Sequence, residues 1–481
     1  MSYEPREGPT TPLSQARGAA EEQARRLPVG LVAIGGAVLA LLLVVMFVVL
    51  DYGFDQAPHR LVKILLGATV VVSIVMRPRF GLWLFAIATP FLAWMPQLGI
   101  PGVNPLNVLL YSIIVSFALT RIAQRKPLLR GGSLTVPLVV MVAIMVISVV
   151  RGAAYPASPD FSAGAAGQQV FRSIVTLFGY FVALMMLEGA KDRRVFSWAI
   201  VIALLLEALV TINNGRDGSG GRALGSLGQS NELGTFLALY VVVAAALLPA
   251  AKSHLARLTL LGAVAAGTFA VFLSVSRGAL IGVGLGLLFV GLRSSRWMAM
   301  LTLLAMLSSP LWIPDYMIER FSETEVAVEG TDVTELEGSA QARIDTWTAM
   351  TDIISEHPLD GVGFTGLFYV LPETGAELGL EEVKDSSHNT FLRFQAEMGI
   401  LGFLVLLWVF WKCFRIGLDG IRLAKTDWDR QLSIGLAAST LVLAVSCAFG
   451  DRFFAVNVVG NFWILCALAD TVRLEHREKA A

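Results

Sequence analysis

Residues 29–50 read VGLVAIGGAVLALLLVVMFVVL, an apolar stretch that contains no charged side chain. The hydrocarbon core of a bilayer is about 30 Å thick, and an α-helix needs about 20 apolar residues to cross it. The stretch follows a polar segment that carries Arg25 and Arg26. It is longer than the apolar region of a signal peptide, and no small-residue cleavage site follows it. We therefore expect a first transmembrane helix with a cytoplasmic basic flank, rather than a cleaved signal.

The composition of the whole chain points to the same class. Of its 481 residues, 55% are apolar and only 15% are charged, and the mean hydropathy is +0.68. A soluble globular protein is closer to one quarter charged. The long unbroken apolar runs also differ from the alternating strands of an outer-membrane barrel. The composition excludes a soluble enzyme with one anchor, a disordered scaffold and a barrel, and it predicts an all-α polytopic membrane protein.

Apolar stretches of membrane length recur along the chain and predict about 14 transmembrane helices. They cover residues 29–50, 61–76, 80–98, 105–121, 134–150, 168–188, 195–213, 231–249, 258–275, 278–293, 297–313, 389–412, 431–449 and 454–472. An even number of helices places both termini on one side of the membrane. The predicted organisation is a cytoplasmic tail, helices 1–11, a large periplasmic loop, helices 12–14 and a second cytoplasmic tail, at residues 1–28, 29–313, 314–388, 389–472 and 473–481.

The distribution of basic residues indicates which predicted loops lie in the cytoplasm. With the N-terminus inside, the predicted cytoplasmic segments hold 25 of the 37 Lys and Arg residues. Cytoplasmic loops carry the excess of Lys and Arg in membrane proteins. The chain is therefore expected in the bacterial inner membrane, with both termini in the cytoplasm.

The predicted periplasmic loop, residues 314–388, is acidic and contains one helical pattern. It holds 17 Asp and Glu residues against three basic ones, Arg320, Arg343 and Lys384. Residues 343–356 place apolar side chains at helical spacing, namely Ile344, Trp347, Met350, Thr351 and Ile354. We expect an amphipathic helix against the membrane surface or the bundle, with Trp347 as an interfacial anchor, that ends before the turn at 358–363.

Two groups of arginines lie at predicted periplasmic boundaries. Residues 214–232 form a glycine-rich segment with Arg216 and Arg222, and Arg277 lies in a turn with almost no polar spacer between two apolar helices. Glycine lets the backbone approach a ligand closely, and the guanidinium group binds phosphate oxygens with several donors. These arginines are candidate phosphate ligands. The alternative is a flexible loop with arginines that extend to the membrane surface.

Two further polar turns lie at the same predicted boundary. His388 stands where the acidic loop meets the next apolar helix, and an imidazole there can accept a proton from an attacking hydroxyl group. A structural role for His388 is the alternative. Asp451 and Arg452 lie in a tight turn and are expected to hold helices together. The loop acids lack the spacing of a calcium-binding loop, and no metal, cofactor or nucleic-acid motif is present.

Taken in order, these segments resemble the O-antigen ligase/polymerase family of membrane proteins (WaaL/Wzy-type). The resemblance spans about residues 215–405 and rests on RALGSLGQSN at 222–231, SRGAL at 276–280, RIDTW at 343–347, PLDGVG at 358–363, SHN at 387–389 and EMGILG at 397–402. The loop is more acidic than is usual in the family, and fourteen helices is a high number for it.

The resemblance implies an integral-membrane glycosyltransferase of the GT-C class, which moves glycan from an undecaprenyl-pyrophosphate-linked donor to a sugar hydroxyl without a metal and with inversion. The acceptor would be lipid A–core for a ligase, or a lipid-linked repeat unit for a polymerase. His388 would be the catalytic base, and Arg222, Arg277 and Arg343 would bind the pyrophosphate. A transporter or flippase of lipid-linked saccharides, or a structural subunit of an envelope complex, remains an alternative.

Overall fold

The computed structural model describes residues 72, 74, 77–94, 105–123, 125, 130–216, 218, 221–312, 325–327, 334–336, 338–380, 383 and 386–480. This part is helical apart from one antiparallel pair of strands, β1 (Glu325–Ala327) and β2 (Thr334–Leu336). The chain divides into two compact units, Met1–Leu82 with Gln97–Arg130, and Trp83–Pro96 with Gly131–Ala481.

In the first unit the described elements are the beginning of α4 (Pro78–Ala88) and α5 (Pro105–Ala123). The Ser116 hydroxyl of α5 donates a hydrogen bond to the Ile74 carbonyl (3.2 Å). Gly81 lies so close to Ile113 that a larger side chain would displace it. The predicted helix 29–50 and nearly all of 61–76 lie outside the described residues.

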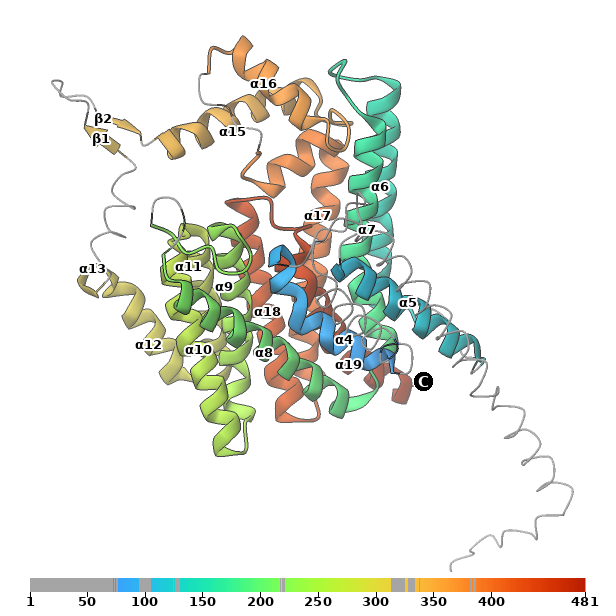
Figure 1. Ribbon diagram of the computed structural model, residues 1–481, viewed down its shortest axis with the longest axis vertical. Helices are drawn as coiled ribbons and strands as arrows, with labels where there is room; N and C mark the ends of the chain where they lie inside the picture. The colour runs from blue at the N-terminus through green and yellow to red at the C-terminus, as the bar shows by residue number, and fades with distance from the viewer. Residues whose placement is uncertain are drawn as a thin grey trace, which may run out of the picture. The chain divides into compact units, whose positions relative to one another are not determined.

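The second unit is a helical bundle (Figure 1). In the part of the chain that the structure describes, eight helices are long and apolar enough to cross a membrane: α6 (Thr135–Ala154), α7 (Ala163–Met186), α8 (Gly189–Asn214), α9 (Ser230–Leu247, extended by η2, Leu248–Ala250), α10 (His254–Ser274), α11 (Arg277–Ser294), α17 (Thr390–Leu423) and α18 (Asp427–Ala448). The remaining elements are η1 (Thr89–Trp94), α12 (Arg296–Leu307), α13 (Ser309–Trp312), α15 (Gly338–Glu356), α16 (Leu367–Glu377) and α19 (Val456–Ala480). The all-helical membrane class is confirmed, whereas the count of fourteen and the side of the large loop remain predictions.

The bundle has a buried centre and an apolar periphery. The apolar part of α9 is 89% buried, against 28% for α10. Central α19 is not among the eight because it carries polar residues such as Asn461 and Asp470, both fully buried. The Asn461 amide donates to the Ala86 carbonyl (2.8 Å). A helix covered by other helices can keep polar groups if each has a partner, so hydropathy alone underestimates the helices of the bundle centre.

Helix α17 is kinked where the turn at 358–363 bonds to it. Gly399 has φ 65° and ψ −166°, which breaks the helix, and a Cβ atom there would overlap the Leu359 carbonyl. The turn at 358–363 bonds to the broken helix, through Val362 N to Ala396 O (2.8 Å), Gly363 N to Glu397 O (3.0 Å) and Ile400 N to Pro358 O (3.0 Å). The PLDGVG and EMGILG segments therefore form one connection, which holds α15 and α16 near the beginning of α17 (Figure 1).

The predicted amphipathic helix is confirmed as α15, and its buried face agrees with the prediction in part. Of the predicted residues, Met350 is buried and Trp347 and Ile354 pack against the same apolar cluster, whereas Ile344 is 45% exposed and Thr351 is also exposed. The buried residues Ala342, Thr346, Ala349 and Ile353 add to this face. Residues of α16 and Ala396 of α17 complete the cluster.

Candidate functional site

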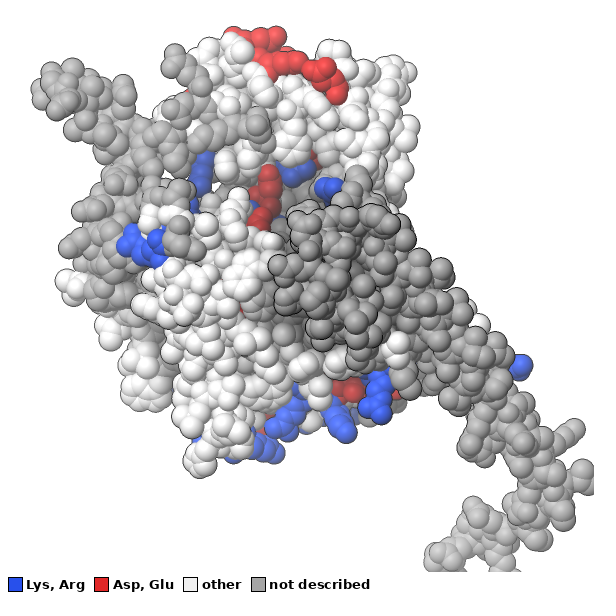
Figure 2. All heavy atoms as spheres, viewed as in Figure 1, with Lys and Arg blue, Asp and Glu red and all other residues white. Residues whose placement is uncertain are grey.

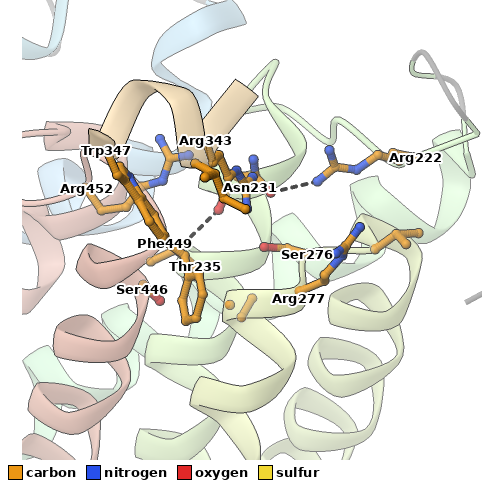
Figure 3. A pocket seen from close by; sticks show the side chains of 14 residues that line it. Arg222, Asn231, Thr235, Ser276, Arg277, Arg343, Trp347, Ser446, Phe449 and Arg452 are labelled. Carbon is orange, nitrogen blue, oxygen red and sulfur yellow. Dashed lines mark hydrogen bonds between the residues drawn. The ribbon is translucent and has the colours of Figure 1, made fainter. Parts of the chain in front are cut away.

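A cavity of about 200 Å³ lies at one end of the bundle (Figure 3). It is lined by Arg222, Asn231, Thr235, Val275, Ser276, Arg277, Gly278, Ala279, Arg343, Ile344, Trp347, Ser446, Phe449 and Arg452. These residues come from the glycine-rich segment, the beginnings of α9 and α11, one face of α15, and the end of α18 with the turn that follows it. Three arginines that were singled out in the sequence, Arg222, Arg277 and Arg343, thus line the same cavity.

The turn between α10 and α11 directs the beginning of α11 toward this cavity. Val275 adopts the left-handed conformation (φ 49°, ψ 36°), which reverses the chain within two residues. Helix α11 then begins at Arg277, and the lining includes Gly278 and Ala279 of its first turn. The first amides of a helix have no partner within it, and the helix dipole adds partial positive charge there. The SRG turn therefore presents a guanidinium group and a helix N-terminus together, an arrangement suited to an anion.

Arg222 donates hydrogen bonds to two neighbouring segments. Its Nε donates to the Ser274 carbonyl (3.1 Å), and its Nη2 donates to the Asn231 side-chain oxygen (2.7 Å). Figure 3 shows this side chain reaching from the glycine-rich segment toward Asn231. These two bonds help to fix the direction in which the guanidinium group points.

A buried carboxylate supports the same segment from within the bundle. Glu207 of α8 is fully buried and accepts hydrogen bonds from the Ser226 amide (2.9 Å), the Ser226 hydroxyl and the Thr211 hydroxyl (3.5 Å). Gly225 (φ 57°) lies so close to Glu207 that a side chain would not fit. Sequence reasoning missed Glu207, although an ionisable residue in an apolar helix was a sufficient signal.

Arg343 and Trp347 lie one turn apart on α15 and face the cavity. The Trp347 indole Nε1 donates to the Ser387 carbonyl (3.0 Å). Trp347 was predicted to anchor the helix at a membrane interface, and its polar atom is in fact used to join α15 to the turn that contains His388.

His388 lies in that turn, next to the cavity but not among its lining residues. It is half-buried and has a positive φ of 49°. Ser387 before it donates to both carboxylate oxygens of Asp451 (2.7 Å each). Asn389 after it caps α17 by accepting from the Phe391 and Leu392 amides (3.0 and 3.2 Å). The backbone on both sides of His388 is thus fixed, and Trp347 connects it to the cavity wall.

The Gly450–Asp451–Arg452 turn both holds neighbouring segments together and lines the cavity. The sequence predicted only the first of these roles. Asp451 holds the His388 turn through Ser387, as expected of a structural residue. Arg452 instead lines the cavity. Its Nη1 contacts Gln229 Oε1 (3.1 Å) and Glu232 Oε1 (3.4 Å). The sequence could not show this, because which of two adjacent side chains faces the cavity depends on how the turn packs.

The end of the bundle opposite the cavity is closed by charge pairs. Arg193 of α8 makes two bonds to Asp429 of α18 (2.7 and 2.9 Å) and pairs with Glu475 of α19. Asp470 of α19 accepts from the Tyr180 hydroxyl, the Ser133 amide and the Ser133 hydroxyl (2.5, 2.7 and 2.5 Å). Among the described residues, no group of His, Cys, Asp and Glu is placed to hold a metal ion at either end.

The fold and the site together define a polytopic helical membrane protein with an arginine-lined cavity at one end of its bundle. The family model for O-antigen ligase matches residues 261–407 of the chain. The resemblance found in the sequence is confirmed for this part. The match includes Arg277, Arg343 and His388, whereas Arg222 and Arg452 lie outside it. No curated protein sequence matches the chain.

Proposed function

We propose that the chain is a membrane glycosyltransferase that transfers glycan from an undecaprenyl-pyrophosphate-linked donor to a sugar hydroxyl group. The observation that carries this proposal is the convergence of Arg222, Arg277 and Arg343, which are far apart in sequence, on one cavity beside the turn that contains His388. The O-antigen ligase domain supports the reaction class.

The arginines meet the main electrostatic demand of this reaction. When the bond between the sugar and the pyrophosphate breaks, negative charge grows on the leaving diphosphate. Donors that are already in position stabilise such charge strongly where water is excluded. Arg222 and Arg277 supply cations at the cavity wall, and the first turn of α11 adds backbone amides. Arg343 approaches from α15, so the diphosphate would be held between the bundle and the loop helix without a metal ion.

His388 is the candidate base. As the acceptor hydroxyl attacks the anomeric carbon, its proton passes to the imidazole, while the bond to the diphosphate oxygen breaks on the opposite face. This in-line attack inverts the anomeric centre. General base catalysis of this kind contributes about 10²- to 10⁴-fold in rate, and the bonds of Ser387 and Asn389 keep the imidazole-bearing backbone in one place.

The reaction would take place on the periplasmic side of the bacterial inner membrane. On the face drawn in Figure 2, Lys and Arg gather along the lower edge of the bundle, and Asp and Glu along the upper edge. The positive-inside rule assigns the basic edge to the cytoplasm. This supports a periplasmic site with the donor's polyprenyl tail among membrane lipids. The acceptor is lipid A–core or a lipid-linked repeat unit.

Transport of a lipid-linked saccharide is less well supported. A transporter must open its two ends in turn around a site near the membrane midplane. The cavity instead lies at one end, and the buried pairs of Arg193, Asp429 and Asp470 close the other. Opening that end would require these buried pairs to separate.

The test compares the wild type with His388→Ala in nanodiscs that contain lipid-linked oligosaccharide and either lipid A–core or a second lipid-linked unit. We expect product from the wild type alone, with donor binding preserved in the variant. A ladder that stays on the lipid identifies a polymerase, and glycan on lipid A–core identifies a ligase. Equal product from both proteins removes His388 as the base. Lipid translocation in liposomes without any product supports transport instead.

A further inference from the structure

Arg452 is a buried cation whose hydrogen-bonding capacity is only partly used. Its side chain is 8% exposed and lines the cavity. Nη1 contacts Gln229 and Glu232, and in the described part of the chain its other nitrogens, Nε and Nη2, have no hydrogen-bond partner. Neither nitrogen is among the described polar atoms that are buried without a partner, so both are accessible from the cavity. A group that enters the cavity can therefore accept hydrogen bonds from them.

Other buried arginines of the bundle are compensated more fully. Arg193 has two carboxylates, and Arg393 contacts the carboxylates of Glu397 (3.1 Å) and Asp451 (3.7 Å) and lies over the Phe368 ring. Arg452 has one carboxylate, Glu232, at 3.4 Å, and the Asn457 amide also binds Glu232 (2.7 Å). Part of the Glu232 charge is therefore engaged elsewhere, and the Arg452 charge remains available to the cavity.

The absence of a side chain at Gly450 allows the Arg452 side chain to fold back over its own turn. A Cβ atom at Gly450 would come within 3.0–3.2 Å of Nε, Nη2 and Cζ of Arg452. The guanidinium group thus passes directly over a glycine, which leaves room for it. Glycine at 450 and the contact with Glu232 together fix the direction of the side chain.

We propose that Arg452 is a fourth ligand of the donor's diphosphate, held in position by Glu232. This proposal rests on the proposed function. A diphosphate presents several charged oxygen atoms, and guanidinium groups bind such oxygens with paired donors. Arg222 and Arg277 approach from the glycine-rich segment and α11, whereas Arg452 approaches from the turn between α18 and α19. The diphosphate would be held from opposite walls of the cavity.

The experiment measures binding of undecaprenyl diphosphate, undecaprenyl monophosphate and inorganic pyrophosphate to the full-length protein in phosphatidylcholine nanodiscs. Arg452→Gln retains a donor for Gln229 and Glu232 but removes the charge. We expect its Kd for undecaprenyl diphosphate to rise about 10- to 100-fold, the range of one charged hydrogen-bonding group, with a smaller change for the monophosphate. The matched control is Arg415→Gln, which removes an arginine that is 42% exposed on α17, and its Kd should equal that of the wild type.

Two further variants separate ligand binding from a structural role. Glu232→Gln keeps an oxygen that accepts from Arg452 but removes the negative charge, so binding of the diphosphate should become several-fold tighter, and this gain should shrink in the Arg452→Gln background. Gly450→Ala keeps Arg452 but displaces its guanidinium group, so binding should weaken. If Arg452 only holds helices together, Glu232→Gln will not tighten binding.

The outcomes distinguish this proposal from the proposed function. If the wild type binds the lipid diphosphate, and Arg222→Gln and Arg277→Gln weaken it while Arg452→Gln matches Arg415→Gln, the fourth ligand is rejected and the transferase stands. If the wild type fails to bind the lipid diphosphate, both are rejected. If inorganic pyrophosphate binds as tightly as the lipid and depends on Arg452 equally, the site recognises the diphosphate alone. That result still supports the role of Arg452.

Discussion

The two ends of the bundle use arginine in different ways. Helix α18 connects them, since Asp429 lies near its beginning and Ser446 near its end, about 25 Å apart at 1.5 Å per residue. At the Asp429 end, Arg193 is paired with carboxylates of α18 and α19. At the Ser446 end, Arg452 contacts Gln229 and the Glu232 carboxylate through Nη1, the latter at 3.4 Å. A guanidinium group that is closely paired with two carboxylates stabilises the fold, whereas one with a single distant carboxylate can still bind a ligand.

The largest effect on stability is expected for Arg193→Gln. This change leaves Asp429, which is 2% exposed, without its cation, and breaking a buried pair costs about 3–5 kcal/mol. Thermal unfolding in detergent should show a large loss of stability. The cavity arginines would be untouched, so donor binding should be normal in the fraction that remains folded. Wild-type stability would mean that the closed end is not held by this pair.

An arginine-to-glutamine substitution at the cavity end should reduce activity rather than stability. Arg277→Gln removes a cation next to the leaving group, and loss of one such group costs about 10²- to 10³-fold in rate. Transfer assays and unfolding should be run together on the purified variant. We expect a large loss of turnover with nearly unchanged stability. A stability loss as great as that of Arg193→Gln would remove the distinction between the two ends.

Gly399→Ala should affect both properties. The positive φ at this residue costs about 1–3 kcal/mol for another residue type, and the added Cβ overlaps the Leu359 carbonyl. The turn at 358–363 would separate from α17 and move Arg343 away from the cavity. Limited proteolysis of the segment around α15 should become faster. Gly131→Ala, where a Cβ meets nothing, is the matched control and should behave as the wild type.

The smallest effect concerns an exposed ion pair on the cavity side. Arg151 of α6 donates to Asp360 (2.8 Å). Partial burial would raise the pKa of Asp360, but the hydrogen bond and charge of Arg151 outweigh it and hold the pKa below its ordinary value of 3.8. The pair therefore stabilises the fold above that pH, and this contribution is lost as the pH falls through the lowered pKa.

Because the Asp360 side chain is 55% exposed, the pair is expected to contribute only about 0.2–1 kcal/mol. Unfolding temperatures between pH 3 and 6 should therefore decline slightly more for the wild type than for Asp360→Asn. Identical pH profiles would show that solvent screens this pair completely.

The sequence predicted the membrane class, the helix α15 and the three arginines that meet in the cavity, because apolar length and charge near a membrane boundary are local properties. It did not predict the kink at Gly399, which depends on hydrogen bonds to a turn about forty residues earlier. It also assigned only a structural role to Arg452, because which donors of a guanidinium group already have partners can be seen only in the three-dimensional structure. The buried face of α15 was predicted only in part, because the burial of Ala349 and Ile353 depends on contacts with segments that are distant in sequence.

The kink in α17 also imposes an order of events on synthesis. The amides of Val362 and Gly363 find their acceptors on Ala396 and Glu397, and the carbonyl of Pro358 finds its donor on Ile400. A nascent chain has made the whole of α15 and α16 before any of these partners leaves the ribosome. The wall that carries Arg343 can therefore close over the cavity only after the beginning of α17 has emerged.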